Sequence, residues 1–194
     1  GGVDGGYSVA LGQDNSIYIT GYVGQSINDQ VAQGETDAVV MKFNADGSKA
    51  WVKSFGTAYF DAGNALAIAA NGHIFVTGVL SNGYGGDAIV KGYTEVTRHP
   101  QAFLAEFDPS GTSVSIRTTA TTPLPESGTA TDLGGWAVGQ AVAAGRDGSV
   151  YVGGNAFGQI NGQTATNGWD GYIAKFAAST WAAPNQLGAL TTAQ

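Results

Sequence analysis

The sequence predicts an all-β chain made of three copies of one four-stranded antiparallel unit. Three observations lead to this prediction: a pair of sequence blocks recurs, turn dipeptides separate short apolar runs, and glycine is abundant. Glycine accounts for 31 of 194 residues, whereas ordinary chains contain about 7%. Glycine does not recur at every third residue, so the chain is not collagen-like. No convincing helical periodicity appears between the apolar runs.

The recurring blocks predict the first hairpin of each unit. Both blocks shift by the same number of residues from copy to copy, and the three pairs occupy residues 6–21, 63–78 and 139–154. Between the blocks stand the dipeptides DN at 14–15, NG at 71–72 and DG at 147–148. Such dipeptides accept positive φ at both central positions of a two-residue turn, so we expect a β-hairpin in each copy.

A second hairpin follows each first one. Its segments are 36–55, 101–117 and 169–176, the last followed by a degenerate turn at 178–180. The strands are nearly continuous apolar runs rather than strict alternations, which is typical of a sheet covered on both faces. A repeated four-stranded antiparallel unit with both faces covered predicts the blade of a β-propeller.

The domain organisation predicted from these repeats is a single β-propeller segment. Its parts are blade 1 at about 5–56, blade 2 at about 57–118 with an insertion at 91–100, an inserted loop at 118–135, blade 3 at about 136–181 and an irregular tail at 182–194. Propellers typically have about 4 to 8 blades, so three blades do not close a ring. We expect an incomplete ring or a segment of a larger propeller, with blades from another copy as the alternative.

One set of motifs resembles the bacterial SBBP-type β-propeller repeat. These motifs are DAVVMKF at 37–43, Asp46-Gly47, Trp51, Phe55-Gly56, GNALA at 63–67 and IFVTG at 74–78. The match is strongest across the first and second copies, and the third departs from it, with Gly153 where Thr20 and Thr77 stand. The resemblance implies a propeller in extracytoplasmic or secreted bacterial proteins, without a shared catalytic centre, and it supplies no active-site residues.

Charge and composition exclude several classes of function. The net charge of −7 and the pI near 4.5 argue against nucleic acid and anionic membranes, which both require clustered cations. The apolar runs are too short for a transmembrane helix. The absence of cysteine excludes disulfides, thiolate nucleophiles and cysteine-ligated zinc. It fits bacterial surface proteins, although cytosolic proteins without cysteine are also common.

Aspartates at repeated positions are the candidate metal ligands. Asp37, Asp87 and Asp170 each precede an apolar strand, and Asp4 and Asp61 form a second equivalent pair. Their side chains can accept backbone N–H bonds and fix the entry of the strand. Oxygen ligands at repeated positions can alternatively bind Ca²⁺. We favour the structural role and predict no cofactor, with calcium as the alternative.

The remaining motifs carry little chemistry. GYGGDA at 83–88 has the spacing of a dinucleotide site, but a strand rather than a helix follows it. His73 and His99 are expected to be solvated loop residues, which is not the arrangement of a metal site or a catalytic triad. Tyr59, Tyr84 and Tyr93 lie in glycine-rich loops and are the candidate ligand contacts, because aromatic faces stack on sugars.

The sequence therefore predicts a non-catalytic structural or protein-interaction module of a bacterial secreted or cell-surface protein, with the periplasm as the alternative location. An appendage such as a flagellum, an S-layer or an adhesin is one setting for it. The expected partners are another protein or neighbouring copies or blades, contacted through the loops at 91–100 and 118–135. A carbohydrate-binding propeller and part of a propeller hydrolase or lyase are the alternatives.

Overall fold

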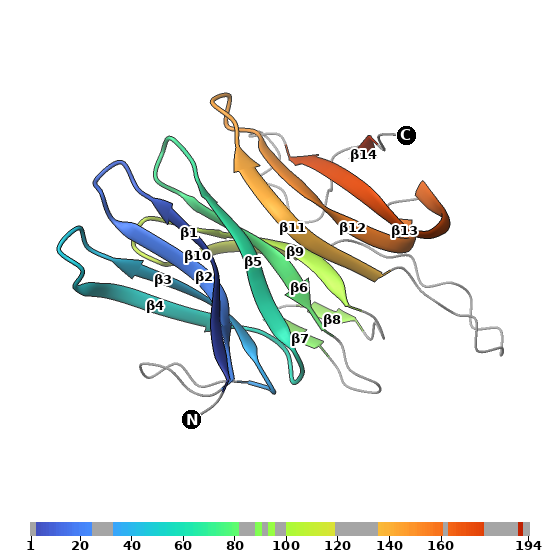
Figure 1. Ribbon diagram of the computed structural model, residues 1–194, viewed down its shortest axis with the longest axis horizontal. Helices are drawn as coiled ribbons and strands as arrows, with labels where there is room; N and C mark the ends of the chain where they lie inside the picture. Colours follow the sequence, from blue (N-terminus) through green and yellow to red (C-terminus); the bar gives the residue numbers. More distant parts are fainter. Residues whose placement is uncertain are drawn as a thin grey trace.

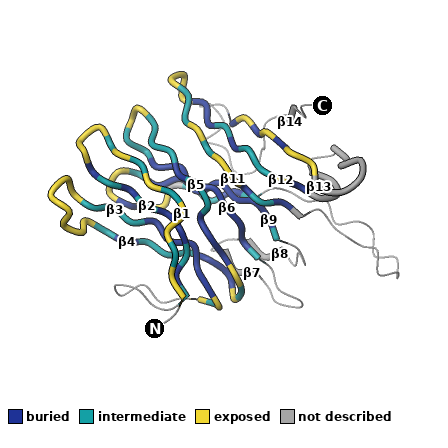
Figure 2. Tube along the Cα trace, viewed as in Figure 1, coloured by how far each residue is buried: buried dark blue, intermediate teal, exposed yellow. Residues whose placement is uncertain are grey.

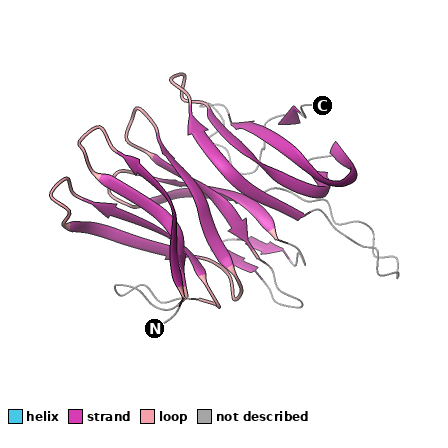
Figure 3. Ribbon diagram, in the orientation of Figure 1, coloured by secondary structure: helices cyan, strands magenta, loops and turns pink. Residues whose placement is uncertain are grey.

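All secondary structure in the described residues is β. The computed structural model describes residues 3–24, 33–81, 88–90, 93–95, 100–118, 136–160, 163–176 and 190–191. They form three four-stranded antiparallel sheets and one two-stranded ribbon (Figure 3). The predicted all-β class and the four-stranded antiparallel unit are confirmed. The described part of the chain contains no helix that could cross a membrane.

The first and second sheets are each built of two hairpins. In the first sheet, the order follows the chain: β1 (Asp4–Leu11), β2 (Ile17–Val23), β3 (Asp37–Phe43) and β4 (Lys49–Phe55). The second sheet repeats this order with β5 (Asp61–Ile68), β6 (Ile74–Leu80), β9 (Gln101–Phe107) and β10 (Ser113–Thr118). The ribbon of β7 (Ala88–Val90) and β8 (Tyr93–Glu95) is inserted between β6 and β9.

The third sheet departs from the prediction at its second half. It contains β11 (Trp136–Ala144), β12 (Val150–Ile160), β13 (Gln163–Phe176) and β14 (Leu190–Thr191). β12 and β13 are longer than the apolar runs that predicted them, because their pairing continues to Ile160 and Gln163. β14 lies within the predicted irregular tail and pairs with Ile173 and Ala174, so a short fourth strand is present there.

The five described hairpin turns share one conformation, and in the three first hairpins it replaces the predicted two-residue turn. Each closes with a backbone hydrogen bond across five residues, as from Gly12 N to Ser16 O, and contains one residue of positive φ instead of two. A turn followed by one left-handed residue is the usual three-residue hairpin loop. The left-handed residues are Asn15, Gly47, Gly72, Gly111 and Gly148.

Aspartate side chains fix four of these turns by bonding to a serine two residues ahead. In the first, Ser16 N donates to Asp14 Oδ1 over 3.0 Å and Ser16 Oγ donates to Oδ2 over 2.7 Å. Such bonds favour the charged carboxylate, and the Ser16 hydroxyl accordingly lowers the pKa of Asp14. The amides of Ser48, Ser110 and Ser149 donate likewise to Asp46, Asp108 and Asp147, although Asp108 is the first residue of its turn and the other aspartates are the third. The repeated turn chemistry therefore extends beyond glycine.

The three sheets stack face to face, with their first strands side by side (Figure 1). The strand β5 contacts β1, β2 and β3 on one side and β11 on the other, so the second sheet lies between the first and the third. We call the side of a sheet that faces the next sheet along the chain its rear face. The side that faces the preceding sheet is its front face.

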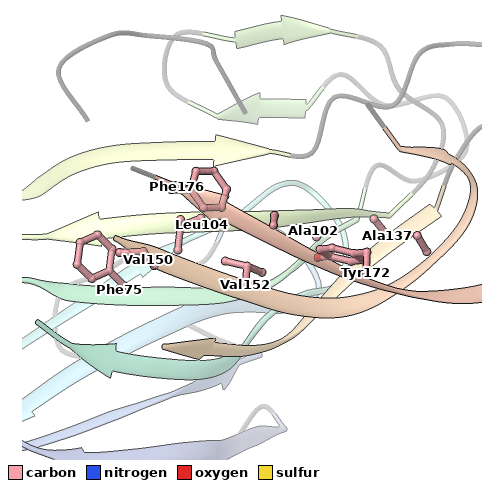
Figure 4. Close-up of a cluster of buried hydrophobic side chains, with 10 residues drawn as sticks. Phe75, Ala102, Leu104, Ala137, Val150, Val152, Tyr172 and Phe176 are labelled. Atoms are coloured by element: carbon pink, nitrogen blue, oxygen red, sulfur yellow. The ribbon is translucent and has the colours of Figure 1, made fainter. Parts of the chain in front are cut away.

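Apolar side chains fill both junctions between sheets. Figure 2 shows by its colours that long stretches of the strands in the second sheet are buried. The cluster between the second and third sheets joins Phe75 and Leu104 to Val152 and Tyr172 (Figure 4). The cluster between the first and second sheets joins Tyr18 and Val40 to residues that include Leu66 and Phe103. Strands buried on both faces explain why the apolar runs are nearly continuous.

Strand pairing places equivalent residues of the three sheets in one common register. The rear faces carry an aromatic, a small and a branched or leucine side chain at matching positions. These are Tyr18, Ala38 and Val40 in the first sheet, Phe75, Ala102 and Leu104 in the second, and Tyr151, Gly171 and Ile173 in the third.

Candidate functional site

Two of the predicted aspartates meet where the first and second sheets join. Asp37 begins β3 and Asp61 begins β5, and the two chain entries are held by a parallel bridge between Thr36 and Phe60. Asp61 N donates to Thr36 O over 3.0 Å, and Thr36 Oγ1 donates to Asp61 O over 3.1 Å. These bonds place two fully buried carboxyl groups at the same junction.

The Asp61 carboxylate accepts backbone hydrogen bonds from two neighbouring segments. Its Oδ1 accepts Ser81 N over 2.7 Å and Thr57 Oγ1 over 3.2 Å, and its Oδ2 accepts Thr57 N. Burial, opposed by these hydrogen bonds, raises the pKa of Asp61 to about 7, and the nearby Asp37 carboxylate adds to the increase. Asp61 therefore connects the end of β6 and the entry to β5 within one hydrogen-bonded centre.

The Asp37 carboxylate is satisfied on one side only. Its Oδ2 accepts the amide of Gln33 over 3.0 Å, while Oδ1 is buried without a hydrogen-bond partner among the described residues. Burial raises the pKa of Asp37, and the amides of Gln33 and Gly34 oppose this increase. A buried polar atom without a partner destabilises a fold, so Asp37 is the less well satisfied member of the pair.

Gly56 brings the two carboxyl groups close together. A Cβ at this position would overlap Asp61 Oδ2 and would lie 2.8 Å from Asp37 Oδ1. Only a residue without a side chain leaves room for both oxygens there. The glycine after Phe55, which the repeat motif contains, is therefore required by the close approach of the two carboxyl groups.

This arrangement fits carboxyl groups that fix the beginnings of β3 and β5 rather than groups that bind or react with a ligand at the surface. Both side chains are fully buried, so neither carboxylate reaches the surface, and Asp61 already accepts three donors. Calcium binding needs 6–8 oxygen ligands, whereas the described residues contain no group of three or more metal-ligating side chains. Calcium at these aspartates stays the alternative to the structural role.

The other three aspartates lie elsewhere. Asp4 has the register of Asp61 and accepts Gly24 N over 3.0 Å, but it is exposed. Asp170 has the register of Asp37 and is exposed too. Asp87 lies outside the described residues, and pairing with Leu80 places Gln101 at the equivalent position of the second sheet. Grouping Asp87 with Asp37 and Asp170 was therefore wrong, because the strand after Asp87 belongs to the inserted ribbon.

Of the three predicted tyrosines, only Tyr59 has a described side chain. Tyr59 is half-buried, with its carbonyl accepting Thr36 N over 3.3 Å. Tyr84 lies outside the described residues, as does the side chain of Tyr93. A row that the sequence did not suggest contains Tyr7, Tyr22 and Phe60, with ring centroids 5.3 and 5.8 Å apart. Tyr7 and Phe60 are exposed.

His73 was expected to be solvated, and this expectation was wrong. Its Nδ1 lies 2.7 Å from Oε1 of Glu106, a residue that is almost fully buried in β9. Glu106 stands in the register of Lys42 and Lys175, so one strand position carries opposite charges in neighbouring sheets. Comparison of the three aligned copies would have revealed this exchange. His99 lies outside the described residues.

Exchange of Asp37 for asparagine is expected to stabilise the protein by about 1 kcal/mol at pH 7. The amide keeps an acceptor for Gln33 N, removes a buried charge and places a donor on the side of Asp61. The second sheet already has an amide, Gln101, at this position. Urea denaturation of wild type, Asp37→Asn and the exposed control Asp170→Asn measures the effect. A loss of stability in Asp37→Asn would contradict the prediction, because it would show that interactions of the Asp37 carboxylate stabilise the fold by more than burial of its charge destabilises it.

Comparison with known proteins gives one partial similarity. The chain is 27% identical over 187 residues to Regulatory protein FlaEY of Caulobacter vibrioides. The aligned part covers 91% of this chain and 18% of the relative, so the chain spans less than a fifth of the length of that protein. No family model matches the chain.

Proposed function

We propose that the chain is a non-catalytic structural and protein-interaction module of a bacterial secreted or cell-surface protein. The observation that carries this proposal is the buried junction, where the Asp61 carboxylate accepts hydrogen bonds from the Thr57 and Ser81 amides. The side-chain chemistry of this junction thus serves the joining of the first sheet to the second. A module of this kind acts through the surfaces that its sheets and loops present.

Within this proposal, the three sheets are consecutive blades of a β-propeller of the SBBP type. The support comes from the side-by-side first strands β1, β5 and β11 and from the face-to-face stacking of four-stranded antiparallel sheets. In a propeller, the blades surround a central channel. We assign β1, β5 and β11 to the channel side, and the fourth strands β4, β10 and β14 to the outer side.

The partial similarity to a protein named as regulatory supports a role in binding rather than in catalysis. The similarity covers only 18% of the relative, so the proposal extends to the module and not to the whole of that protein.

Two measurements on the full-length gene product test the proposal. Electron cryo-microscopy should show blades surrounding an axis, with β1, β5 and β11 innermost; an open linear stack would contradict the propeller. Cell fractionation with added protease should recover the tagged protein outside the cytoplasmic membrane and accessible to digestion. Recovery in the cytoplasm would contradict the proposed location.

Carbohydrate binding is the second candidate, and the exposed aromatic row favours it. Tyr7 and Phe60 present exposed rings beside Tyr22, and aromatic faces stack on sugar rings. A glycan array should show binding that Tyr7→Ala removes and that the control Tyr151→Ala, in another sheet, retains. An array without signal, or signal unaffected by Tyr7→Ala, would exclude this site.

A further inference from the structure

On the front face of the first sheet, the side chains of β1 are exposed although their counterparts in the other sheets are packed, whereas Val23, Val39 and Val52 on the same face are buried. In β1, Val9 is 65% and Leu11 is 67% exposed, and the strand contains no buried residue (Figure 2). The register equivalent of Val9 in the second sheet is Leu66, which is 7% exposed and packs against the first sheet. In the third sheet, it is Val142, which packs in the junction with the second.

The rear face of the third sheet also exposes an apolar side chain whose counterparts in the other sheets are packed. Ile173 is 50% exposed, whereas its equivalents Val40 and Leu104 are 0% and 2% exposed inside the two junctions. Each internal junction joins one rear face to one front face. The described chain thus leaves the β1 part of one front face and Ile173 of one rear face exposed, and these two faces are of complementary type.

We propose that the front face of the first sheet binds the rear face of the third sheet of a second copy of this chain. The inference rests on the proposed role as a structural module and names its partner. The contact would place Tyr151, Gly171 and Ile173 of one copy against Val9 and Leu11 of the next, as the rear faces of the first two sheets lie against their neighbours. Such head-to-tail contacts form a ring when the rotation closes and an open chain when it does not.

One detail distinguishes this contact from the two internal junctions. Inside the chain, Thr20 fills the space that a side chain on Gly63 would take, and Thr77 does the same at Gly139. The corresponding residues of the proposed contact are Gly153 and Gly6, so the threonine is missing. We therefore expect an association that is weaker than the internal junctions and depends on protein concentration.

Restoring the missing side chain provides a gain-of-function test. A Cβ on Gly153 would have no atom closer than 3.8 Å, which is Tyr172 O, so the first atom of a side chain has room there. Thr20 and Thr77 donate their hydroxyls to the equivalent carbonyls of Val39 and Phe103. We expect Gly153→Thr to tighten association about tenfold, from one added buried contact.

Sedimentation velocity across a concentration series measures this association against the 19.7 kDa mass of one chain. Val9→Lys blocks the front face and Ile173→Lys blocks the rear face, and each side chain is exposed in the single chain. Neither variant should associate alone, but their mixture should form a one-to-one dimer that grows no further. The control Ala50→Lys changes an exposed residue of β4 and should associate as wild type does.

Three outcomes would overturn the inference. In the first, all variants, including Gly153→Thr, remain single chains at every concentration. In the second, Ile173→Lys still forms dimers alone while Val9→Lys does not, which indicates a symmetric contact between two front faces. In the third, the mixture of the two lysine variants stays monomeric. None of these results changes the blade arrangement or the location measured on the full-length protein, so the two proposals fail independently.

Discussion

Asp61→Asn is expected to remove most of the pH dependence of stability between about pH 4 and pH 8. Burial raises the pKa of Asp61 from its ordinary value of 3.8 to about 7. The folded protein therefore holds the proton more tightly than the unfolded chain does. The resulting stabilisation is fully present below the unfolded pKa and is lost as the pH rises through 7.

The size of this effect makes it one of the two largest that the structure predicts. A difference of one pKa unit corresponds to about 1.4 kcal/mol, so the shift of Asp61 amounts to about 4 kcal/mol across this range. Asp37 faces Asp61 and contributes in the same direction, because burial raises its pKa also. The turn aspartates Asp14, Asp46, Asp108 and Asp147 have lowered pKa values, and their contributions are lost at more acidic pH.

Urea denaturation at several pH values tests this prediction. Wild type should lose stability from about pH 4 to pH 7, while Asp61→Asn should give a much flatter profile. At pH 4 the variant should be the less stable protein, since one of its amide hydrogens faces the donors Thr57 N or Ser81 N. The control Asp4→Asn alters the exposed register equivalent and should keep the wild-type slope. An unchanged slope in Asp61→Asn would refute the assignment.

Gly63→Ala is expected to destabilise the protein by about 3 kcal/mol. The added methyl group would overlap Thr20 Oγ1, and Thr20 is fully buried and donates to Val39 O over 2.8 Å. Either the threonine rotates and loses its hydrogen bond, or the first and second sheets move apart. Both responses act on the junction that contains Asp37 and Asp61.

The first sheet supplies a matched control for this substitution. Gly6 has the register of Gly63, but a Cβ there would meet only Ile19 Cγ2, at 3.6 Å. Gly6→Ala should therefore leave stability unchanged or raise it by a few tenths of a kcal/mol, because alanine restricts the unfolded chain. Thermal unfolding of both variants, at concentrations where the chain is monomeric, measures the difference. Equal losses in the two variants would show that the residue matters within its own sheet and not at the junction.

The strands were predictable because their signal is local. Recurring runs such as 17–21 and 74–78 lie within β2 and β6, and the second hairpins match β3, β4, β9 and β10. The turn type was not predictable from its dipeptides, since Asn15 adopts positive φ alone while Asp14 bonds to Ser16 instead. Side-chain hydrogen bonds of this kind compete with the simpler two-residue turn.

The candidate site was predictable only as a set of residue types. The repeats identified Asp37 and Asp61, but they did not show that these aspartates meet, because that depends on how two separate sheets stack. The insertion between β6 and β9 also displaced the alignment and gave Asp87 a position that belongs to Gln101. His73 and Glu106 are 33 residues apart, and only strand pairing brings them together.

The two junctions differ in their polar residues, and this difference bears on how such a chain assembles. The first junction has Asp37 and Asp61 where the second has Gln101 and Ala137. Proteins built from similar repeats are prone to misassembly, in which a unit joins the wrong neighbour while the chain is still being synthesised. A third sheet that docked directly on the first would place Ala137 beside Asp37, and Thr57 N would lose the Asp61 carboxylate to which it donates. The unequal junctions thus give the order of the units a thermodynamic preference during biosynthesis.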